Sequence, residues 1–361
     1  MRFTYDALPS RVIFGVGSVD QVAPEVGRLG VTRVLTIHGR SEAAIASRVS
    51  GALGARAAGL IDEVTLHVPL EVAEAGRRRA RDVAADGLVA IGGGSATGLA
   101  KAIALEQGQP IVAVPTTYAG SEMTPIYGLT SEGRKATGRD MRVLPRVVIY
   151  DPALTTTLPA GVTAGSGMNA IAHAVEGLYA PGANPMLSLL AKEAIRVLSR
   201  ALPILVQDPA DLTARTQAMY AAYLAGVVQG AAGMGVHHRI CHVLGGTYGL
   251  GHGNVNAVIL PHAVRYNTEA APQAIARVAE ALDAEDAAVA LFDLAARIGA
   301  PNSLKALGMP EEKLEEAAHL AAEPPPSNPR PVTAKDLLVL LNNAYAGRHP
   351  ARAEASTAVQ A

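Results

Sequence analysis

The stretch "VAIGGGSATGLAKAIA" (residues 89–104) joins a β-branched run to an alanine-rich helical stretch through three glycines and a serine. A strand that turns through glycines into a helix is typical of a parallel sheet with crossover helices. Glycines without a Cβ let the backbone approach a pyrophosphate, and the first amides of a helix favour its charge. Because the spacing is neither G-x-G-x-x-G nor a P-loop, a plain strand-to-helix turn is the alternative interpretation.

Similar runs lie on both sides of this loop. The stretches 32–39, 110–122 and 146–154 read as further strands, and helical patterns occupy 41–53 and 96–108. This alternation predicts a Rossmann-like parallel sheet in an α/β dinucleotide-binding domain, with ligands bound beyond the carboxyl ends of the strands. We therefore expect the cofactor to contact Gly92, Gly93, Gly94, Ser95, Thr116, Thr117, Ser121, His38 and Arg40.

If the bound dinucleotide is a nicotinamide cofactor, the sequence leaves the choice between NADH and NADPH open. The strand-like residues 33–37 are followed by His38, Gly39 and Arg40. No acidic residue stands there to bind a ribose 2′-hydroxyl and repel a 2′-phosphate, and Arg40 could accept that phosphate. Use of either cofactor is therefore expected.

The second half of the chain has a different pattern. From about residue 160 the chain is rich in Ala and Leu, and 184–207 and 212–233 are the clearest helical stretches. This change predicts two domains and a tail. We expect an NAD(P)-binding α/β domain over residues 1–158, an all-helical substrate and catalytic domain over 159–350, and a flexible tail over 351–361.

The composition argues against several classes of partner. The 361 residues contain 31 Lys and Arg against 32 Asp and Glu, so neither nucleic acid nor an anionic membrane surface is an expected partner. The N-terminal stretch has no apolar signal core, and no run of about 18 apolar residues follows. The single cysteine suits a reducing compartment. We expect a cytoplasmic protein.

The stretch "MGVHHRICHVLGGTYGLGHG" (234–253) contains four of the ten histidines. His238 and His242 are four residues apart and share one face of a helix. His252 follows beyond a glycine-rich loop that can fold it back toward that face. His237 is expected to point elsewhere.

A second helical stretch, "SGMNAIAHAVE" (166–176), places Asn169, His173 and Glu176 on one face. Histidines spaced in this way suit Fe²⁺ or Zn²⁺. Asn169, however, stands where an anionic ligand is expected, and Cys241 lies on the wrong face to replace it. The residues alone leave two alternatives, a weakened metal site and a metal-free imidazole pocket.

These motifs together resemble a known family. "GGGSATGLAKAIAL", "PTTYAGSEMTPI", "SGMNAIAHAVE" and "HHRICHVLGG" are similar to the iron-containing alcohol dehydrogenase superfamily, and within it to the maleylacetate reductase branch. The resemblance extends from residues 5–15 to 328–347. It implies a dehydroquinate synthase-like architecture, with an α/β N-terminal dinucleotide-binding domain and an all-α C-terminal domain.

The resemblance also implies a ligand set. In metal-dependent members, the positions of Asn169, His173, His238 and His252 hold Asp and three His around the metal, and His242 lies near the nicotinamide. Those members carry Asp where this chain has Gly98. Asn169 and Gly98 both match the maleylacetate reductase pattern, which implies a site without a metal. The segment "GHGNVNAV" (251–258) departs from that pattern toward the alcohol dehydrogenase style.

The activity that the resemblance implies is NAD(P)H-dependent reduction of the enone double bond of maleylacetate, or a chlorinated form, to 3-oxoadipate in aromatic-compound degradation. The partner is then a small dicarboxylate, and a homodimer is expected. His173, His238 and His252 would surround substrate oxygens, His242 would donate or orient a proton, and Asn169 would hydrogen-bond a carboxylate. Further candidates for carboxylate binding are Arg239, Lys135 and Arg142.

Other functions are possible for the same architecture. A metal-dependent alcohol or aldehyde dehydrogenase is supported by residues 251–258 and opposed by Asn169. A dehydroquinate synthase-type lyase would use NAD only transiently. A nucleotide-binding scaffold without activity is opposed by the intact set of histidines.

Overall fold

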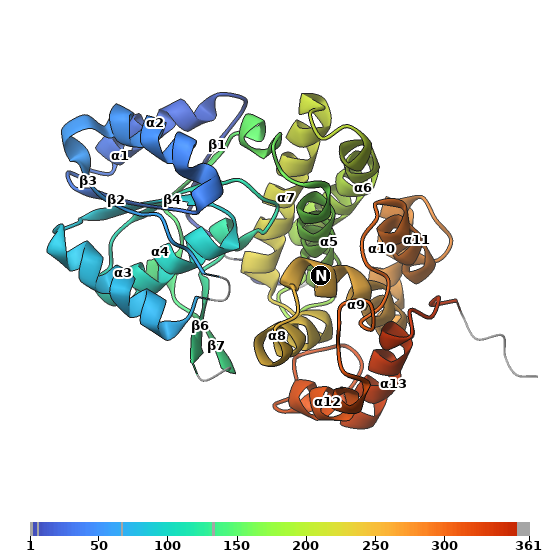
Figure 1. Cartoon of the computed structure of the whole chain (residues 1–361). Coiled ribbons are helices and arrows are strands. Elements are labelled where there is room, and N and C mark those ends of the chain that lie inside the picture. Colours follow the sequence, from blue (N-terminus) through green and yellow to red (C-terminus); the bar gives the residue numbers. More distant parts are fainter. Residues whose placement is uncertain (1–2, 6, 66–67, 132–133, 352–361) are drawn as a thin grey trace, which may run out of the picture.

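The computed structural model describes residues 3–5, 7–65, 68–131 and 134–351. Within these residues the chain forms a sheet half and a helical half, which lie side by side (Figure 1). The last strand of the sheet ends at Tyr150 and the first long helix of the second half begins at Ala160. The predicted division between residues 158 and 159 falls in this connection, and the domain limits stay a prediction. The predicted tail lies outside the described residues from 352 onward.

The predicted parallel sheet is confirmed. Its strands run in the order β1-β8-β5-β4-β2-β3, and every neighbouring pair is parallel. The four expected strands form its centre, because their β-branched side chains are buried on both faces. The strands are β1 (Arg11–Phe14), β2 (Val34–His38), β3 (Ala57–Ile61), β4 (Gly87–Gly92), β5 (Ile111–Pro115) and β8 (Val147–Tyr150).

Helices cover both faces of the sheet (Figure 1). Along β4, Val89 and Ile91 belong to the core shared with α1 and α2, whereas Leu88 and Ala90 belong to the core shared with α3 and α4. This alternation follows from the two-residue period of a strand. The covering helices are α1 (Val22–Arg28), α2 (Ala43–Leu53), α3 (Leu70–Asp82) and α4 (Gly94–Gln107).

A two-stranded antiparallel hairpin, β6 (Ile126–Ser131) and β7 (Arg134–Arg139), was not expected from the sequence. Its polar strands lack the apolar alternation that identifies a strand packed on a core. The hairpin projects from the sheet half at the side that faces the helical half (Figure 1). It therefore adds residues to the space between the two halves.

The second half is helical, as predicted. α5, α6, α7, α10 and α11 share one hydrophobic core, while α8, α9, α12 and α13 surround another. No helix among the described residues is long and apolar enough to cross a membrane. The helices are α5 (Ala160–Gly177), α6 (Pro185–Gln207), α7 (Leu212–Ala232), α8 (Val236–Tyr248), α9 (His252–Asn267), α10 (Pro272–Leu282), α11 (Ala287–Arg297), α12 (Leu314–Ala322) and α13 (Ala334–Tyr345).

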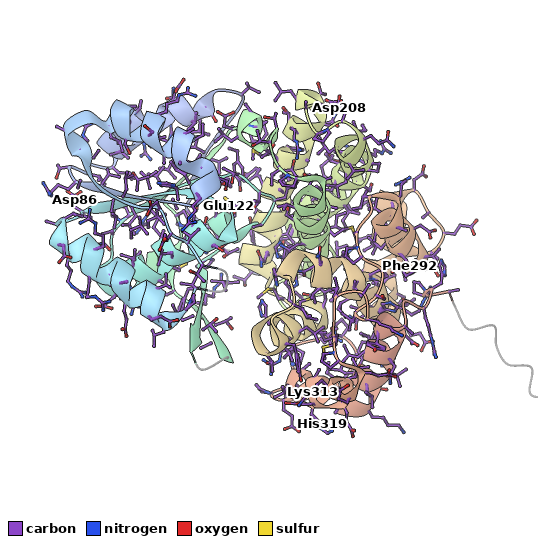
Figure 2. All side chains as sticks on the ribbon, viewed as in Figure 1. Asp86, Glu122, Asp208, Phe292, Lys313 and His319 are labelled. Carbon is purple, nitrogen blue, oxygen red and sulfur yellow. The ribbon has the colours of Figure 1, made fainter. Side chains whose placement is uncertain are left out.

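The junction between the two halves is packed with side chains. Figure 2 shows Glu122 inside the molecule near this junction, whereas Lys313 and His319 lie at the outer edge of the helical half. Glu122 is 2 % exposed and accepts a 2.8 Å hydrogen bond from the Tyr150 hydroxyl. Burial raises the pKa of Glu122, although the Tyr150 hydrogen bond and the charge of Lys101 oppose that rise. Glu122, Tyr150 and Lys101 thus form a group of buried polar side chains at the junction.

Candidate functional site

A cavity of about 600 Å³ lies between the carboxyl ends of the strands and the helical half. Its wall includes the start of α4, the hairpin, the starts of α5 and α9, and one face of α8. In open α/β sheets ligands bind at this edge. The cavity is also of the size that protein sites for small molecules have.

The glycine loop forms one side of the cavity. Gly94, Ser95, Thr117 and Ser121 line it, and their predicted contact with the cofactor stays a prediction. Gly93 precedes α4 without a side-chain cap, so the first amides of α4 remain available for an anion. A Cβ at Gly93 would lie 3.0 Å from the Thr117 side chain, which explains the glycine there. The loop therefore fits a pyrophosphate.

Gly92 and Thr116 lie behind this wall, at the ends of β4 and β5. The Thr116 amide donates a 3.1 Å hydrogen bond to the Gly92 carbonyl. His38 ends β2, is buried, and has its Nδ1 2.8 Å from the Gly39 carbonyl oxygen. These three residues position the loop, and their predicted contact with the cofactor stays a prediction.

Glu42 occupies the place where the sequence indicated no acidic residue. The short 3₁₀ helix Arg40–Glu42 folds back over the end of β2, and Thr116 Oγ1 lies 3.3 Å from a Glu42 carboxylate oxygen. A Cβ at Gly92 would lie 3.8 Å from the same carboxylate. Arg40 points away and pairs with the exposed Glu63 at 3.0 Å. The prediction that no acid lies at this end of β2 is therefore wrong.

The four predicted catalytic histidines come together on the opposite wall. The His173 and His238 rings stack with centroids 4.6 Å apart, and those of His242 and His252 stack at 5.9 Å. The His238 and His242 rings lie edge to face at 6.3 Å. All four line the cavity together with Asn169. The loop 249–251 between α8 and α9 thus returns His252 as expected, and the catalytic roles stay predictions.

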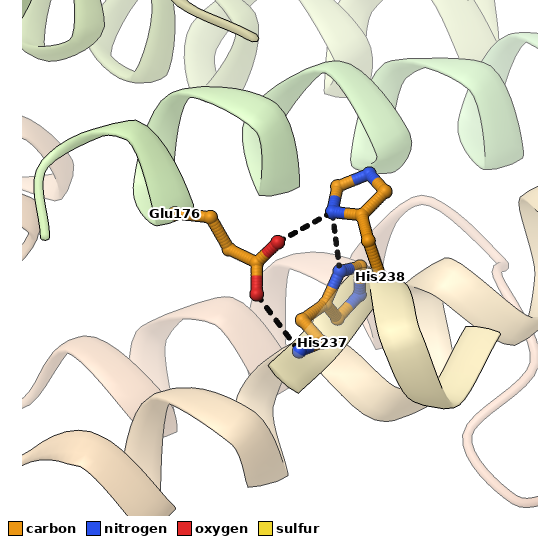
Figure 3. A group of neighbouring side chains, drawn as sticks. All are labelled: Glu176, His237 and His238. Carbon is orange, nitrogen blue, oxygen red and sulfur yellow. Dashed lines mark hydrogen bonds and ion pairs between the residues drawn. The ribbon is translucent and has the colours of Figure 1, made fainter. Parts of the chain in front are cut away.

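Glu176 fixes the orientation of His238. Its two carboxylate oxygens accept hydrogen bonds from His238 Nδ1 at 2.7 Å, from the Gly235 amide at 2.9 Å and from the His237 amide at 2.8 Å. Figure 3 shows Glu176 reaching from α5 toward His237 and His238 on α8. With Nδ1 bound to a carboxylate, His238 presents Nε2, a buried atom with no hydrogen-bond partner among the described residues. This is the arrangement that sets a histidine tautomer.

His173, His237 and Glu176 have shifted pKa values. Burial, reinforced by the neighbouring histidines, lowers the pKa of His173 well below its usual range. Burial lowers the pKa of His237 to about 4. Burial alone would raise the pKa of Glu176, but the hydrogen bond from His238 and its neighbours outweighs burial and lowers it. Glu176 is therefore a carboxylate that accepts, and His238 Nδ1 carries the proton between them.

The donor set fits a divalent metal poorly. Asn169, His173, His238 and His252 would supply no anionic ligand, and the Asn169 amide nitrogen lies 3.4 Å from the Ala119 carbonyl oxygen. Among the described residues, three His, Cys, Asp or Glu ligand atoms lie within 4.8 Å of one another at Glu176, His237 and His238. Since the oxygens of Glu176 already accept three N–H groups, a metal there would displace hydrogen bonds that orient His238.

Two of the three candidate cationic anchors, Arg239 and Arg142, are not among the described residues that line the cavity. Arg239 donates to the carbonyls of Leu320 and Glu323 at 2.7 and 2.6 Å. Arg142 pairs with Asp140 at 2.7 Å. Their predicted role as carboxylate anchors is not supported, because both guanidinium groups are engaged elsewhere. The side chain of Lys135 lies outside the described residues.

Two further residues, His237 and Gln229, were assigned no role from the sequence. His237, expected to point elsewhere, has its Nδ1 3.3 Å from His238 Nδ1 and its Nε2 3.1 Å from the Asn256 carbonyl oxygen. Gln229 of α7 lines the cavity and keeps its buried Oε1 without a hydrogen-bond partner in the described part of the chain. A lone glutamine in a helical stretch carries no spacing signal that would have identified it.

Comparison with known proteins agrees with this architecture. Residues 9–152 match the family model for iron-containing alcohol dehydrogenase, and residues 163–345 match the C-terminal model of the same family. A maleylacetate reductase of Burkholderia cepacia is 52 % identical over 96 % of this chain and 99 % of its own length. A crystal structure of maleylacetate reductase from Agrobacterium tumefaciens has a TM-score of 0.92 and 44 % identity, covering 97 % of this chain and 100 % of its own.

A more distant relative was solved with a nucleotide. The sulfoacetaldehyde reductase of Bifidobacterium kashiwanohense, in complex with NAD⁺, has a TM-score of 0.87 and 26 % identity, covering 95 % of this chain and 99 % of its own. The similarity to the reductases extends through both halves, from the glycine loop to the cluster of histidines. This chain therefore belongs to the iron-containing alcohol dehydrogenase family and is an oxidoreductase of that family, similar along its whole length to maleylacetate reductases.

Proposed function

We propose that this protein reduces the enone double bond of maleylacetate to give 3-oxoadipate, with NADH as the reductant. The observation that carries the proposal is the 52 % identity to a maleylacetate reductase over nearly the full length of both chains. The cavity supports it, because a glycine loop suited to a dinucleotide faces four histidines across one space. The alternatives of a metal-dependent dehydrogenase and of a lyase are not favoured.

Glu42 supports NADH rather than NADPH. Its carboxylate lies at the carboxyl end of β2, beside the first glycine of the loop, where a bound dinucleotide would place a ribose. Ser41 Oγ donates to the second carboxylate oxygen at 2.8 Å, so the group is held on both sides. A carboxylate accepts hydrogen bonds from ribose hydroxyls and repels a 2′-phosphate.

Catalysis without a metal is supported by the neutral donor set. Reduction of a carbon–carbon double bond next to a ketone places negative charge on the ketone oxygen, and hydrogen-bond donors can stabilise that charge. Asn169 can donate through its amide where an aspartate could only accept. Metal independence therefore rests on the chemistry of Asn169 and of the three histidines His173, His238 and His252.

The proposed chemistry distributes roles among these side chains. A nicotinamide bound at the glycine loop would supply the hydride, which would form a C–H bond at the carbon β to the ketone. The π electrons move onto the ketone oxygen, near His173, His238 and His252. His242 delivers a proton to the α carbon, and the enolate returns to a ketone. Glu176 stabilises His238 when its Nε2 carries a proton, because the carboxylate then faces a cation.

The predicted cytoplasmic homodimer remains part of the proposal. Exposed apolar side chains beside the edge strand β1, Phe14 and Val16, support self-association. Light scattering of the purified protein tests the dimer, and cell fractionation tests the compartment.

The activity is tested by following oxidation of NADH and NADPH with maleylacetate and with a panel of small aldehydes. We expect rapid oxidation of NADH with maleylacetate and little with the aldehydes. Preferred turnover of an aldehyde would favour the alcohol dehydrogenase alternative. Conversion of a sugar phosphate without net NADH consumption would favour the lyase.

A further inference from the structure

The cavity contains almost no positive charge for an acidic substrate. Among its described lining residues, Lys101 is the one Lys or Arg. Its ammonium group is fully buried and lies 2.6–2.8 Å from the carbonyl oxygens of Ser121, Thr124 and Ile126. The carboxylates of a dicarboxylate substrate must therefore find other donors.

The start of α9 offers such donors. Gly251, His252, Gly253 and Asn254 all line the cavity, and the first helical hydrogen bond runs from the Val255 amide to the Gly251 carbonyl at 3.0 Å. The amides of Gly253 and Asn254 therefore have no carbonyl acceptor within their own helix. Gly251 provides no side-chain cap. A helix start of this kind, on a 16-residue helix, attracts anions.

The start of α9 is held against α5 at a point without side chains. A Cβ at Gly253 would lie 3.1 Å from the Gly165 carbonyl carbon, and a Cβ at Gly165 would lie 3.1 Å from that of Gly253. Gly165 and Ser166 also line the cavity. The two glycines thus keep the α9 amides at the cavity surface.

Buried polar atoms in the same cavity point to a ligand. Asn169 is 5 % exposed and His238 is 1 % exposed, and both line the cavity. Asn169 Oδ1 and His238 Nε2 have no hydrogen-bond partner among the described residues. Buried polar atoms of this kind are normally satisfied, so a polar ligand is expected beside them.

We propose that the start of α9, residues 251–254, binds the substrate carboxylate that lies on the acetate arm, next to the ketone. This inference rests on the proposed function and names the part of the site that recognises the acid. His252, whose side chain belongs to the ketone-binding set, is the first residue of α9, so the ketone and this carboxylate meet the same helical turn. The amides of Gly253 and Asn254 are the backbone donors of this turn.

The test places a negative charge on this turn. Asn254→Asp conserves size and favours the first turn of a helix, so the fold is retained. We expect the KM for maleylacetate to rise at least about tenfold with little change in kcat. The neutral variant Asn254→Ser should raise KM less. Gln273→Glu, which adds the same charge to the exposed first turn of α10, should leave KM unchanged.

A second substrate locates the effect. 4-Oxopent-2-enoate has the enone and the other carboxylate but lacks the acetate-arm carboxylate, so Asn254→Asp should leave its KM unchanged. An equal rise for both substrates, or no rise for maleylacetate, would overturn the proposal while leaving maleylacetate reduction intact. If the unaltered enzyme does not reduce maleylacetate, the proposed function fails. In that case, the affinity for adipate is measured by calorimetry for the unaltered protein and for Asn254→Asp. Weaker binding by the variant supports the carboxylate subsite, and equal binding overturns it.

Discussion

Glu176 and His238 form a buried pair in which the carboxylate accepts a 2.7 Å hydrogen bond from the imidazole Nδ1, although 62 residues separate them in the chain. Both side chains are at most 2 % exposed. Removing water from such a pair strengthens the hydrogen bond and makes either partner alone costly. The pair therefore directs His238 Nε2 at the cavity.

Replacing Glu176 with glutamine should damage turnover more than cofactor binding. Glu176→Gln keeps an acceptor oxygen but removes the charge that stabilises a protonated His238, so kcat should fall about 10–100-fold. NADH affinity, measured by fluorescence titration, should stay constant because the glycine loop is untouched. A variant that loses NADH affinity and kcat in equal measure would indicate a merely structural role for Glu176.

Glu42 should control cofactor choice. Glu42→Ser removes the carboxylate beside Thr116, and kcat/KM for NADPH relative to NADH should rise at least about tenfold. Glu63→Gln is the matched control, since Glu63 lies on the exposed surface and pairs with Arg40. An unaltered enzyme that already prefers NADPH, or equal effects of the two substitutions, would contradict the assignment.

Gly120 should be required both for the backbone and for the position of His173. Its φ is 78°, and a Cβ there would lie 3.2 Å from His173 Nδ1. Gly108 has a φ of 76° with nothing within 4 Å. Alanine at either position should lower the free energy of unfolding by about 1–2 kcal/mol. Steady-state kinetics should show a fall in kcat for Gly120→Ala alone, and a similar fall for Gly108→Ala would refute the contact.

His262 should make the fold sensitive to acid. Burial lowers its pKa to about 4, and its Nε2 has no hydrogen-bond partner in the described part of the chain. As the pH falls from 7 to 4, His262 takes up a proton in the unfolded chain but largely stays neutral in the folded protein. The free energy of unfolding therefore decreases as the pH falls.

The contribution of His262 can be isolated by comparison with His262→Asn, which does not titrate. Chemical denaturation should show the stability advantage of the unaltered protein over the variant shrinking by about 3 kcal/mol from pH 7 to pH 4. A difference that stays constant over this range would mean that His262 has the same pKa in the folded and the unfolded protein.

The parts of the structure that depend on local sequence were predictable. The glycine loop 92–94 indicates a strand-to-helix turn, because that turn depends only on residues adjacent in sequence. The β-branched runs likewise predicted four of the six strands of the sheet. The histidines were found because three of them keep helical spacing or follow a short loop. Their stacking at 4.6 and 5.9 Å is consistent with that interpretation.

The parts that depend on distant contacts were missed. Glu176 shares a helix face with His173, but its partners Gly235, just before α8, and His238, on α8, lie 59 and 62 residues away. Glu42 lies beyond the end of β2, and only the fold of the 3₁₀ helix brings it back to Thr116. Neither Gln229 nor the hairpin belongs to a repeating apolar pattern in the sequence that would have predicted its position. Tertiary packing, rather than local pattern, therefore places the residues that tune the site.

The central claim is that imidazoles and Asn169 replace a metal in maleylacetate reduction. Its most direct test measures NADH oxidation with maleylacetate before and after dialysis against a strong chelator, with Asn169→Asp assayed in parallel. We predict full activity after dialysis, and no gain in Asn169→Asp on adding Zn²⁺ or Fe²⁺. Activity of the unaltered enzyme that is lost on dialysis and restored by either metal would contradict the account.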